Sequence, residues 1–191
     1  AYLMDGGSIK KICDKHLLPN YGALNDARIF DPGSDFGLVK IRGKSIGVTI
    51  CEDIWTIPTI PTAGRYEYFP RPLEHFANLK KSDPSALDIL VNISASVFSS
   101  GNDTVRRKGG LMCEVSRFVG VPLVWCNLVG GNDEIVFAGG GGFFDASGAE
   151  PKSKCLKKFE ECAEVIDTSS IEGYDGDSFD FSGDADLKRA I

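Results

Sequence analysis

The stretch Gly47-Val-Thr-Ile-Cys-Glu-Asp-Ile-Trp55 decides how the rest of the chain is interpreted. Its β-branched apolar residues, bounded by a glycine and an acidic pair, predict a short buried strand that stops at Cys51. A cysteine at a strand end can present its sulfur to a pocket, and Glu52 and Asp53 open a following turn whose backbone N–H groups can face a developing oxyanion. The alternative is that Cys51 only fills the core, because cysteine is among the most buried residue types.

The composition is that of one globular domain with a hydrophobic core, since 42% of the 191 residues are hydrophobic. The sequence contains no long uninterrupted apolar run and no signal-peptide pattern. We therefore expect a cytoplasmic protein with no membrane partner. The first residue, Ala1, lies within a predicted strand, and this indicates a piece of a longer protein.

The cysteine pattern argues against a zinc site, and the charge distribution argues against a nucleic-acid-binding surface. The six cysteines form no C-x-x-C pair, and with only two histidines no zinc-binding spacing results, so we expect reduced thiols and no metal site. The net charge is −6, but residues 172–186 carry six acidic side chains and no basic one. Because the remaining charges balance, no nucleic-acid partner is predicted.

Apolar patterns predict the other elements. Strands are expected at residues 1–4, 9–13, 38–42, 87–93, 121–129, 135–137 and 142–145. Apolar positions at helical spacing between residues 105 and 119, followed by Gly120, predict one amphipathic helix. Residues 56–85 hold five prolines and are predicted to be an irregular loop, and residues 130–134 are predicted to interrupt a strand.

Four motifs follow one another along the chain: Lys15-His-Leu-Leu-Pro-Asn-Tyr-Gly22, the stretch Gly47 to Trp55, Val91-Asn-Ile-Ser-Ala-Ser-Val-Phe98 and Val129-Gly-Gly-Asn-Asp-Glu-Ile-Val-Phe137. In this order they resemble the motifs of nitrilase-type carbon–nitrogen hydrolases, and more narrowly those of the glutaminase domains of glutamine-dependent NAD synthetases. The resemblance implies an α/β fold, the four-layer α-β-β-α sandwich of the nitrilase type, here truncated at its N-terminus. Residues 1–168 would form the hydrolase domain, and residues 169–191 an acidic linker to an absent synthetase domain.

The resemblance also implies a Glu-Lys-Cys site. Cys51 would be the nucleophile, and Lys15 would stabilise the tetrahedral oxyanion and lower the pKa of the thiol. The family places the general-base glutamate upstream of Lys15, ahead of the first residue of this chain, so we expect the fragment alone to be inactive. Glu52 would contribute its backbone N–H to the oxyanion site, and Asp26 would be a secondary carboxylate where the family usually has glutamate.

Substrate-binding positions carry over in the same way. Tyr21 and Ser96 match positions that bind glutamine in the family. Asn102 stands where the family has a basic residue, and this departure weakens the expected clamp on the glutamine carboxylate.

The function that the resemblance implies is the glutamine amidohydrolase part of an NAD synthetase. Ammonia, released through a cysteine thioester, would pass to a covalently linked synthetase domain that amidates deamido-NAD. No cofactor is expected in this domain, ATP and Mg²⁺ are implied for the synthetase domain, and the protein is expected to be a homo-oligomer. Two alternatives stay open: a stand-alone nitrilase-type amidase, and a catalytically silent scaffold domain, which Asn102 and Asp26 favour.

Overall fold

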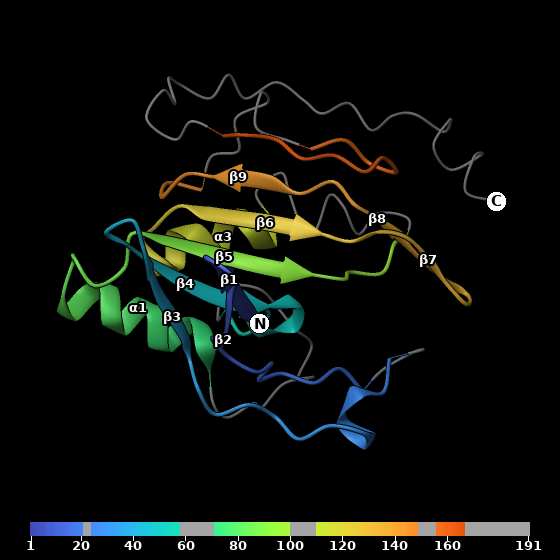
Figure 1. The fold of residues 1–191 in the computed structure, drawn as a ribbon, viewed down its shortest axis with the longest axis horizontal. Helices are drawn as coiled ribbons and strands as arrows, with labels where there is room; N and C mark the ends of the chain where they lie inside the picture. Colours follow the sequence, from blue (N-terminus) through green and yellow to red (C-terminus); the bar gives the residue numbers. More distant parts are fainter. Residues whose placement is uncertain (21–23, 58–70, 100–109, 149–155, 167–191) are drawn as a thin grey trace.

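A five-stranded sheet with helices on one face dominates the computed structural model, which describes residues 1–20, 24–57, 71–99, 110–148 and 156–166 (Figure 1). The strand order is β3-β4-β5-β6-β9. The strands are β3 (Gly37–Ile41), β4 (Lys44–Ile50), β5 (Ile89–Ser94), β6 (Leu123–Asn127) and β9 (Gly142–Phe144). The three central strands run parallel, and β3 and β9 pair antiparallel at the two edges. The strand predicted to stop at Cys51 and the strand predicted at residues 38–42 are confirmed as β4 and β3.

The helices α1 (Pro72–Ser82) and α3 (Leu111–Val119) pack against each other and share one core with the sheet. Helix α3 ends where the sequence predicts, because Gly120 takes the left-handed conformation, with φ 76°, that a glycine adopts without strain. The largest fully buried side chains of this core include Leu73, Phe76, Leu90, Leu111, Leu123, Trp125 and Phe144. Within the part of the chain that the structure describes, no helix has the length and apolar character needed to span a bilayer.

A glycine in the middle of β4 sets how closely the helices approach the sheet. A Cβ atom on Gly47 would lie 3.0 Å from Leu90 Cδ1 and 3.0 Å from Phe76 Cε1, closer than most packed Cβ atoms come to a neighbour, so these side chains would have to shift. The hydrogen atom of glycine therefore leaves the room into which the ring of Phe76 packs. The motif stretch thus begins with a residue that the core requires.

The opposite face of the sheet is also apolar. It presents Ile93 and its neighbour Cys126 on β6, and Ile93 keeps 46% of its surface exposed. Central parallel strands normally carry apolar residues on both faces, because both faces are covered in the folded protein. This two-sided pattern is the one expected for a strand layer inside an α-β-β-α sandwich, of which the described residues supply one helical layer and one sheet.

The prediction that residues 56–85 form an irregular loop is wrong for its second half, which contains helix α1. The prolines do not interrupt this helix, because Pro72 occupies its first turn, where the missing N–H costs no hydrogen bond. Leu73 and Phe76 then point to the core at helical spacing. The remainder of that prediction, residues 58–70, lies outside the described residues.

Two hairpins accompany the sheet. The first, β1 (Tyr2–Asp5) with β2 (Ser8–Lys11), confirms the predicted N-terminal strands. The second, β7 (Val129–Asn132) with β8 (Ile135–Ala138), shows that the predicted strand interruption is misplaced. Gly130 and Gly131 lie within β7, opposite Phe137 and Val136. The chain instead reverses after Asn132, where Asp133 has a positive φ of 51°.

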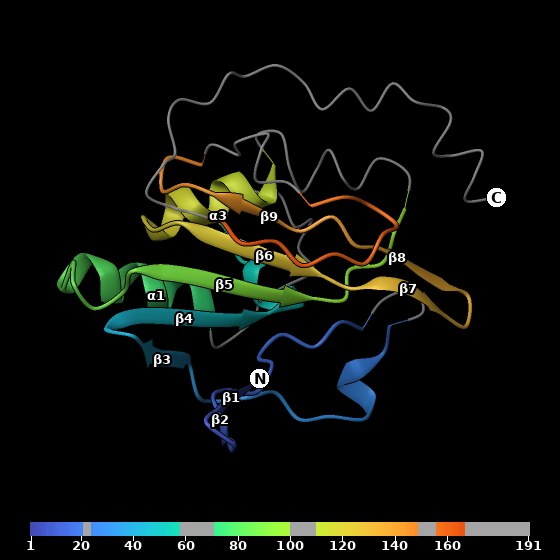
Figure 2. The ribbon, with the colours of Figure 1, turned by 45° about the horizontal axis from the view of Figure 1, so that its top comes forward.

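The end of the described chain runs alongside the glycine-rich segment that precedes β9. The N–H of Leu156 donates to the carbonyl of Gly141, and Lys158 forms an isolated bridge with Gly139 (Figure 2). These contacts hold residues 156–166 near the ends of β5 and β6.

Candidate active site

The carboxyl ends of the parallel strands bring two of the predicted site residues, Cys51 and Ser96, to the same end of the sheet. Strand β4 ends at Ile50, directly before Cys51, and Ser96 follows two residues after the end of β5. The backbone N–H of Ser96 donates to Oδ1 of Asn127, the last residue of β6, over 2.8 Å. Ligand sites of open α/β sheets lie at such carboxyl ends.

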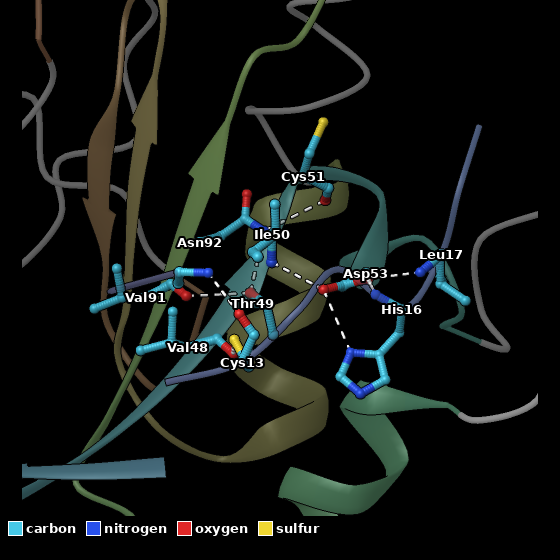
Figure 3. Close-up of polar contacts among 11 residues, drawn as sticks. Cys13, His16, Leu17, Val48, Thr49, Ile50, Cys51, Asp53, Val91 and Asn92 are labelled. Carbon is cyan, nitrogen blue, oxygen red and sulfur yellow. Dashed lines mark hydrogen bonds and ion pairs between the residues drawn. The ribbon is translucent and has the colours of Figure 1, made fainter. Parts of the chain in front are cut away.

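Cys51 stands on a strained turn between β4 and the short 3₁₀ helix η2 (Cys51–Ile54). Its φ is +47°, a region that residues other than glycine rarely adopt. Its Sγ lies 4.0 Å from Oγ of Ser96, and its sulfur points away from the polar contacts below it (Figure 3). Backbone strain of this kind is held in place by surrounding contacts and is concentrated at functional sites.

A buried amide holds the strained residue. Asn92, with no exposed surface, donates through Nδ2 to the carbonyl oxygen of Cys51 at 3.3 Å and to Oγ1 of Thr49 at 3.1 Å (Figure 3). The hydroxyl of Ser94 donates to Oδ1 of Asn92 at 2.5 Å, which fixes the amide orientation. These contacts join the ends of β4 and β5 beneath the thiol.

The Lys15 loop is tied to the Cys51 turn by the carboxylate of Asp53. Oδ1 of Asp53 accepts the backbone N–H groups of His16 and Leu17, each at 2.9 Å, and Oδ2 accepts that of Ile50 at 2.9 Å (Figure 3). Residues far apart in the chain are thereby brought to the same end of β4.

Lys15 itself forms an ion pair. Its Nζ lies 2.8 Å from Oδ2 of Asp26, at the start of the 3₁₀ helix η1 (Asp26–Arg28), and the side chains keep 20% and 32% of their surface exposed. The N–H of Asp26 in turn donates to the carbonyl of Pro19. The structure therefore brings together the two residues that the resemblance implies as oxyanion stabiliser and secondary carboxylate.

Glu52 is buried within η2, and the role of its backbone N–H stays a prediction. Tyr21 and Asn102 lie outside the described residues. Three contributors to the site were not predicted: Asp53, Asn92 and Asn127. Their signal in the sequence is that Asn92 and Asn127 are polar residues within apolar strands, and that Asp53 belongs to the acidic pair that follows the Cys51 strand.

The other thiols differ from Cys51 in their surroundings. Cys13 is 1% exposed, and burial is the main cause that raises the pKa of its thiol. Cys126 and Cys162 are exposed and line a cavity of about 320 Å³ on the other face of the sheet. Among the described residues, no group of three or more His, Cys, Asp and Glu side chains could hold a metal ion.

Comparisons with known proteins agree with this geometry. No family model matches the chain. The glutamine-dependent NAD(+) synthetase of Thermotoga maritima is 36% identical over 148 residues, which cover 78% of this chain and 22% of that protein. The chain thus spans less than a quarter of the length of this relative.

Solved structures show the same fold. A glutamine-dependent NAD(+) synthetase from Acinetobacter baumannii superposes with a TM-score of 0.68 at 24% identity, over 84% of this chain and 26% of that one. A CN-hydrolase superfamily protein from Xanthomonas campestris superposes with a TM-score of 0.60 at 15% identity, over 82% and 51% of the two chains. By sequence the chain is therefore similar to part of the glutamine-dependent NAD(+) synthetases, and its fold is the one seen in these two solved structures.

Proposed function

We propose that this chain is the glutamine amidohydrolase part of an NAD synthetase. The observation that carries the proposal is the position of Cys51, on a strained turn at the carboxyl end of β4, one of the three parallel strands of a CN-hydrolase-like fold. The relatives that match in sequence bear the name glutamine-dependent NAD(+) synthetase, and this name supports glutamine as the substrate.

The proposed reaction proceeds through a thioester. Sγ of Cys51 attacks the side-chain carbonyl carbon of glutamine, and the oxyanion that forms is stabilised by the ammonium of Lys15 and the backbone N–H of Glu52. The thiol proton passes through a carboxylate, which the family resemblance puts ahead of Lys15, to the leaving nitrogen. The carbon–nitrogen bond breaks and ammonia leaves. Water then adds to the thioester, the sulfur leaves with a proton, and glutamate is released.

The remaining roles follow the same resemblance. Tyr21, Ser96 and Asn102 would contact glutamine, and Asp26 would hold the ammonium of Lys15. The Ser96 hydroxyl lies beside the nucleophile, which supports its place at the substrate. The ammonia would pass to a covalently linked synthetase part, where ATP and Mg²⁺ would act, and no step of the amide hydrolysis passes through either of them.

Cys51→Ala in the intact protein that contains this chain tests the proposal. NAD formation from deamido-NAD should be lost with glutamine as the nitrogen donor and retained with ammonium, because only the amide hydrolysis needs the thiol. Cys126→Ala is the matched control and should keep both activities.

Other results separate the alternatives. Wild-type protein that uses ammonium but never glutamine would identify a silent scaffold domain. Hydrolysis of other small amides, without any NAD formation from either donor, would identify a stand-alone amidase. If Cys51→Ala lost NAD formation equally with glutamine and with ammonium, Cys51 would have a structural role in the core instead.

A further inference from the structure

Asp53 is a buried side chain for which the proposed reaction has no role. It is 1% exposed, yet it is a carboxylate, and an unpaired charge in such a place is costly. Its two oxygens are compensated by three backbone N–H groups, and hydrogen bonds of this kind to an ionised acceptor are short and strong. The imidazole Nδ1 of His16 lies 3.8 Å away, too far for a hydrogen bond.

The three donors flank the two proposed catalytic residues. His16 and Leu17 directly follow Lys15 in the chain, and Ile50 directly precedes Cys51. Within η2 the contact to Ile50 is local, because an acidic residue in the first helical turn commonly reaches back to the preceding N–H. The contacts to His16 and Leu17 are not local, since they span 37 and 36 residues.

We propose that Asp53 is a positioning residue of this site: its carboxylate fixes the backbone after Lys15 to the backbone before Cys51 and so sets the ammonium beside the thiol. The inference rests on the proposed function, because the distance between Lys15 and Cys51 matters only if both residues take part in the reaction. A misplacement of about 1 Å between reacting groups costs up to about a hundredfold in rate.

Asparagine cannot replace this carboxylate. Asp53→Asn keeps the size of the side chain but leaves one acceptor oxygen, and its NH₂ group would then face either the Ile50 N–H or the pair from His16 and Leu17. One of the two attachments must therefore break, and the Lys15 loop is released from the Cys51 turn.

The test is the pH dependence of Cys51 alkylation by iodoacetamide in the intact protein, with each cysteine followed by mass spectrometry. Two roles of Asp53 predict shifts of opposite sign. If the residue acts only as a nearby negative charge, its removal stabilises the thiolate, and the alkylation midpoint moves to lower pH. If it positions Lys15, the thiolate loses its ammonium neighbour, and the midpoint moves to higher pH, with a rate at neutral pH lower by about tenfold or more.

Asp88→Asn is the matched control. Asp88 also accepts a β4 backbone N–H, that of Ser45 at 2.7 Å, but at the opposite end of the strand. The Asp88→Asn variant should leave the pH profile of Cys51 alkylation unchanged.

In glutamine hydrolysis Asp53→Asn should lower kcat by more than tenfold with a smaller change in KM, since the substrate contacts are not altered directly.

A shift to lower pH, or no shift, in folded Asp53→Asn would overturn the inference. If that variant does not fold, Asp53→Glu provides the test, because it keeps the charge but moves the oxygens by one methylene: a slower Cys51 supports positioning, and the wild-type rate overturns it. Absence of selective Cys51 reactivity in the wild-type protein would instead contradict the proposed function, so the two failures are distinguishable.

Discussion

The side-chain amide of Asn92 lies 3.3 Å from the carbonyl oxygen of Cys51, and this contact holds the strained turn at Cys51 against the neighbouring strand β5. The same nitrogen donates to Oγ1 of Thr49, so one amide contacts the residues before and after Ile50, the last residue of β4. The positive φ of Cys51 is therefore maintained by a buried contact rather than by the local sequence.

Asn92→Leu should destabilise the protein and slow the reaction of Cys51. Leucine has a similar volume but leaves the Cys51 carbonyl and the hydroxyls of Thr49 and Ser94 without this partner, at a cost of about 1–3 kcal/mol in the free energy of unfolding. Urea unfolding and the rate of Cys51 alkylation check the two effects. Ser94→Ala is the control: it removes only the hydrogen bond to Asn92 Oδ1 and should cost about 1 kcal/mol. An equal slowing of Cys51 in Ser94→Ala would contradict the role given to Asn92.

The cysteines should react with iodoacetamide in a defined order at neutral pH. Cys51 should react first, because the proposed function makes it the nucleophile, and exposed Cys126 should follow. Cys13 should be slowest: burial raises the pKa of its thiol, so less thiolate is present at a given pH, and its rate should rise only under more alkaline conditions. A mass-spectrometric time course on each cysteine measures this order.

Lys15→Ala should reduce the Cys51 rate to that of Cys126. Lys44→Ala is the matched control, because Lys44 is also ion-paired, to Asp88 at 3.3 Å, but lies at the opposite end of β4. Loss of the Cys51 preference in both variants would show that the general charge of the protein, and not Lys15, sets the reactivity.

Sequence patterns predicted the strands well and the polar framework of the site poorly, for a physical reason. Strands such as β4 and β5 are apolar runs with clear boundaries, so local residues are sufficient to place them. Helix α1 does not follow from the sequence pattern, because prolines normally interrupt a helix, whereas Pro72 lies in the first turn, where a helix accepts proline.

The role of Asp53 depends on contacts that no local pattern encodes. Two of its partners are backbone N–H groups 36 and 37 residues away, and every residue except proline carries such a donor. The strand that ends before Cys51 could therefore be predicted from local residues, while the group that connects it to the Lys15 loop required the folded chain.

The ion pair between Lys15 and Asp26 should matter for turnover more than for stability. Both side chains are partly exposed, so Asp26→Asn should change the free energy of unfolding by less than about 1 kcal/mol. Glutamine hydrolysis by the intact protein should nevertheless fall by about tenfold, because the ammonium loses the group that holds it at 2.8 Å. Asp26→Glu should retain most of the turnover, since it keeps the carboxylate.

Asp14→Asn is the control for the Asp26 variants. The variant removes the exposed ion pair between Asp14 and Lys11. This pair lies directly before Lys15 in the chain but does not involve it, so turnover should be unchanged. Wild-type turnover in Asp26→Asn would show that Lys15 is held by other contacts.

Acid should destabilise the protein through His75. Its imidazole stacks on Phe36, with ring centroids 3.9 Å apart, and Phe36 in turn stacks on His16. Burial, and secondly the charge of His16, lowers the pKa of His75 below its usual 6.5. As the pH falls through about 6.5, the unfolded chain takes up a proton that the folded protein does not, so the free energy of unfolding decreases until the lower folded-state pKa is passed.

His75→Phe should remove this part of the pH dependence, because the phenyl ring keeps an aromatic partner for Phe36 and cannot be protonated. Urea midpoints of wild type and variant, measured at about pH 7.5 and about pH 5.5, give the comparison. The wild-type midpoint should fall more between the two conditions than the variant's. Parallel decreases in the two midpoints would show that the His75 imidazole is protonated as readily in the folded protein as in the unfolded chain, and that the stack with Phe36 does not exclude the charge.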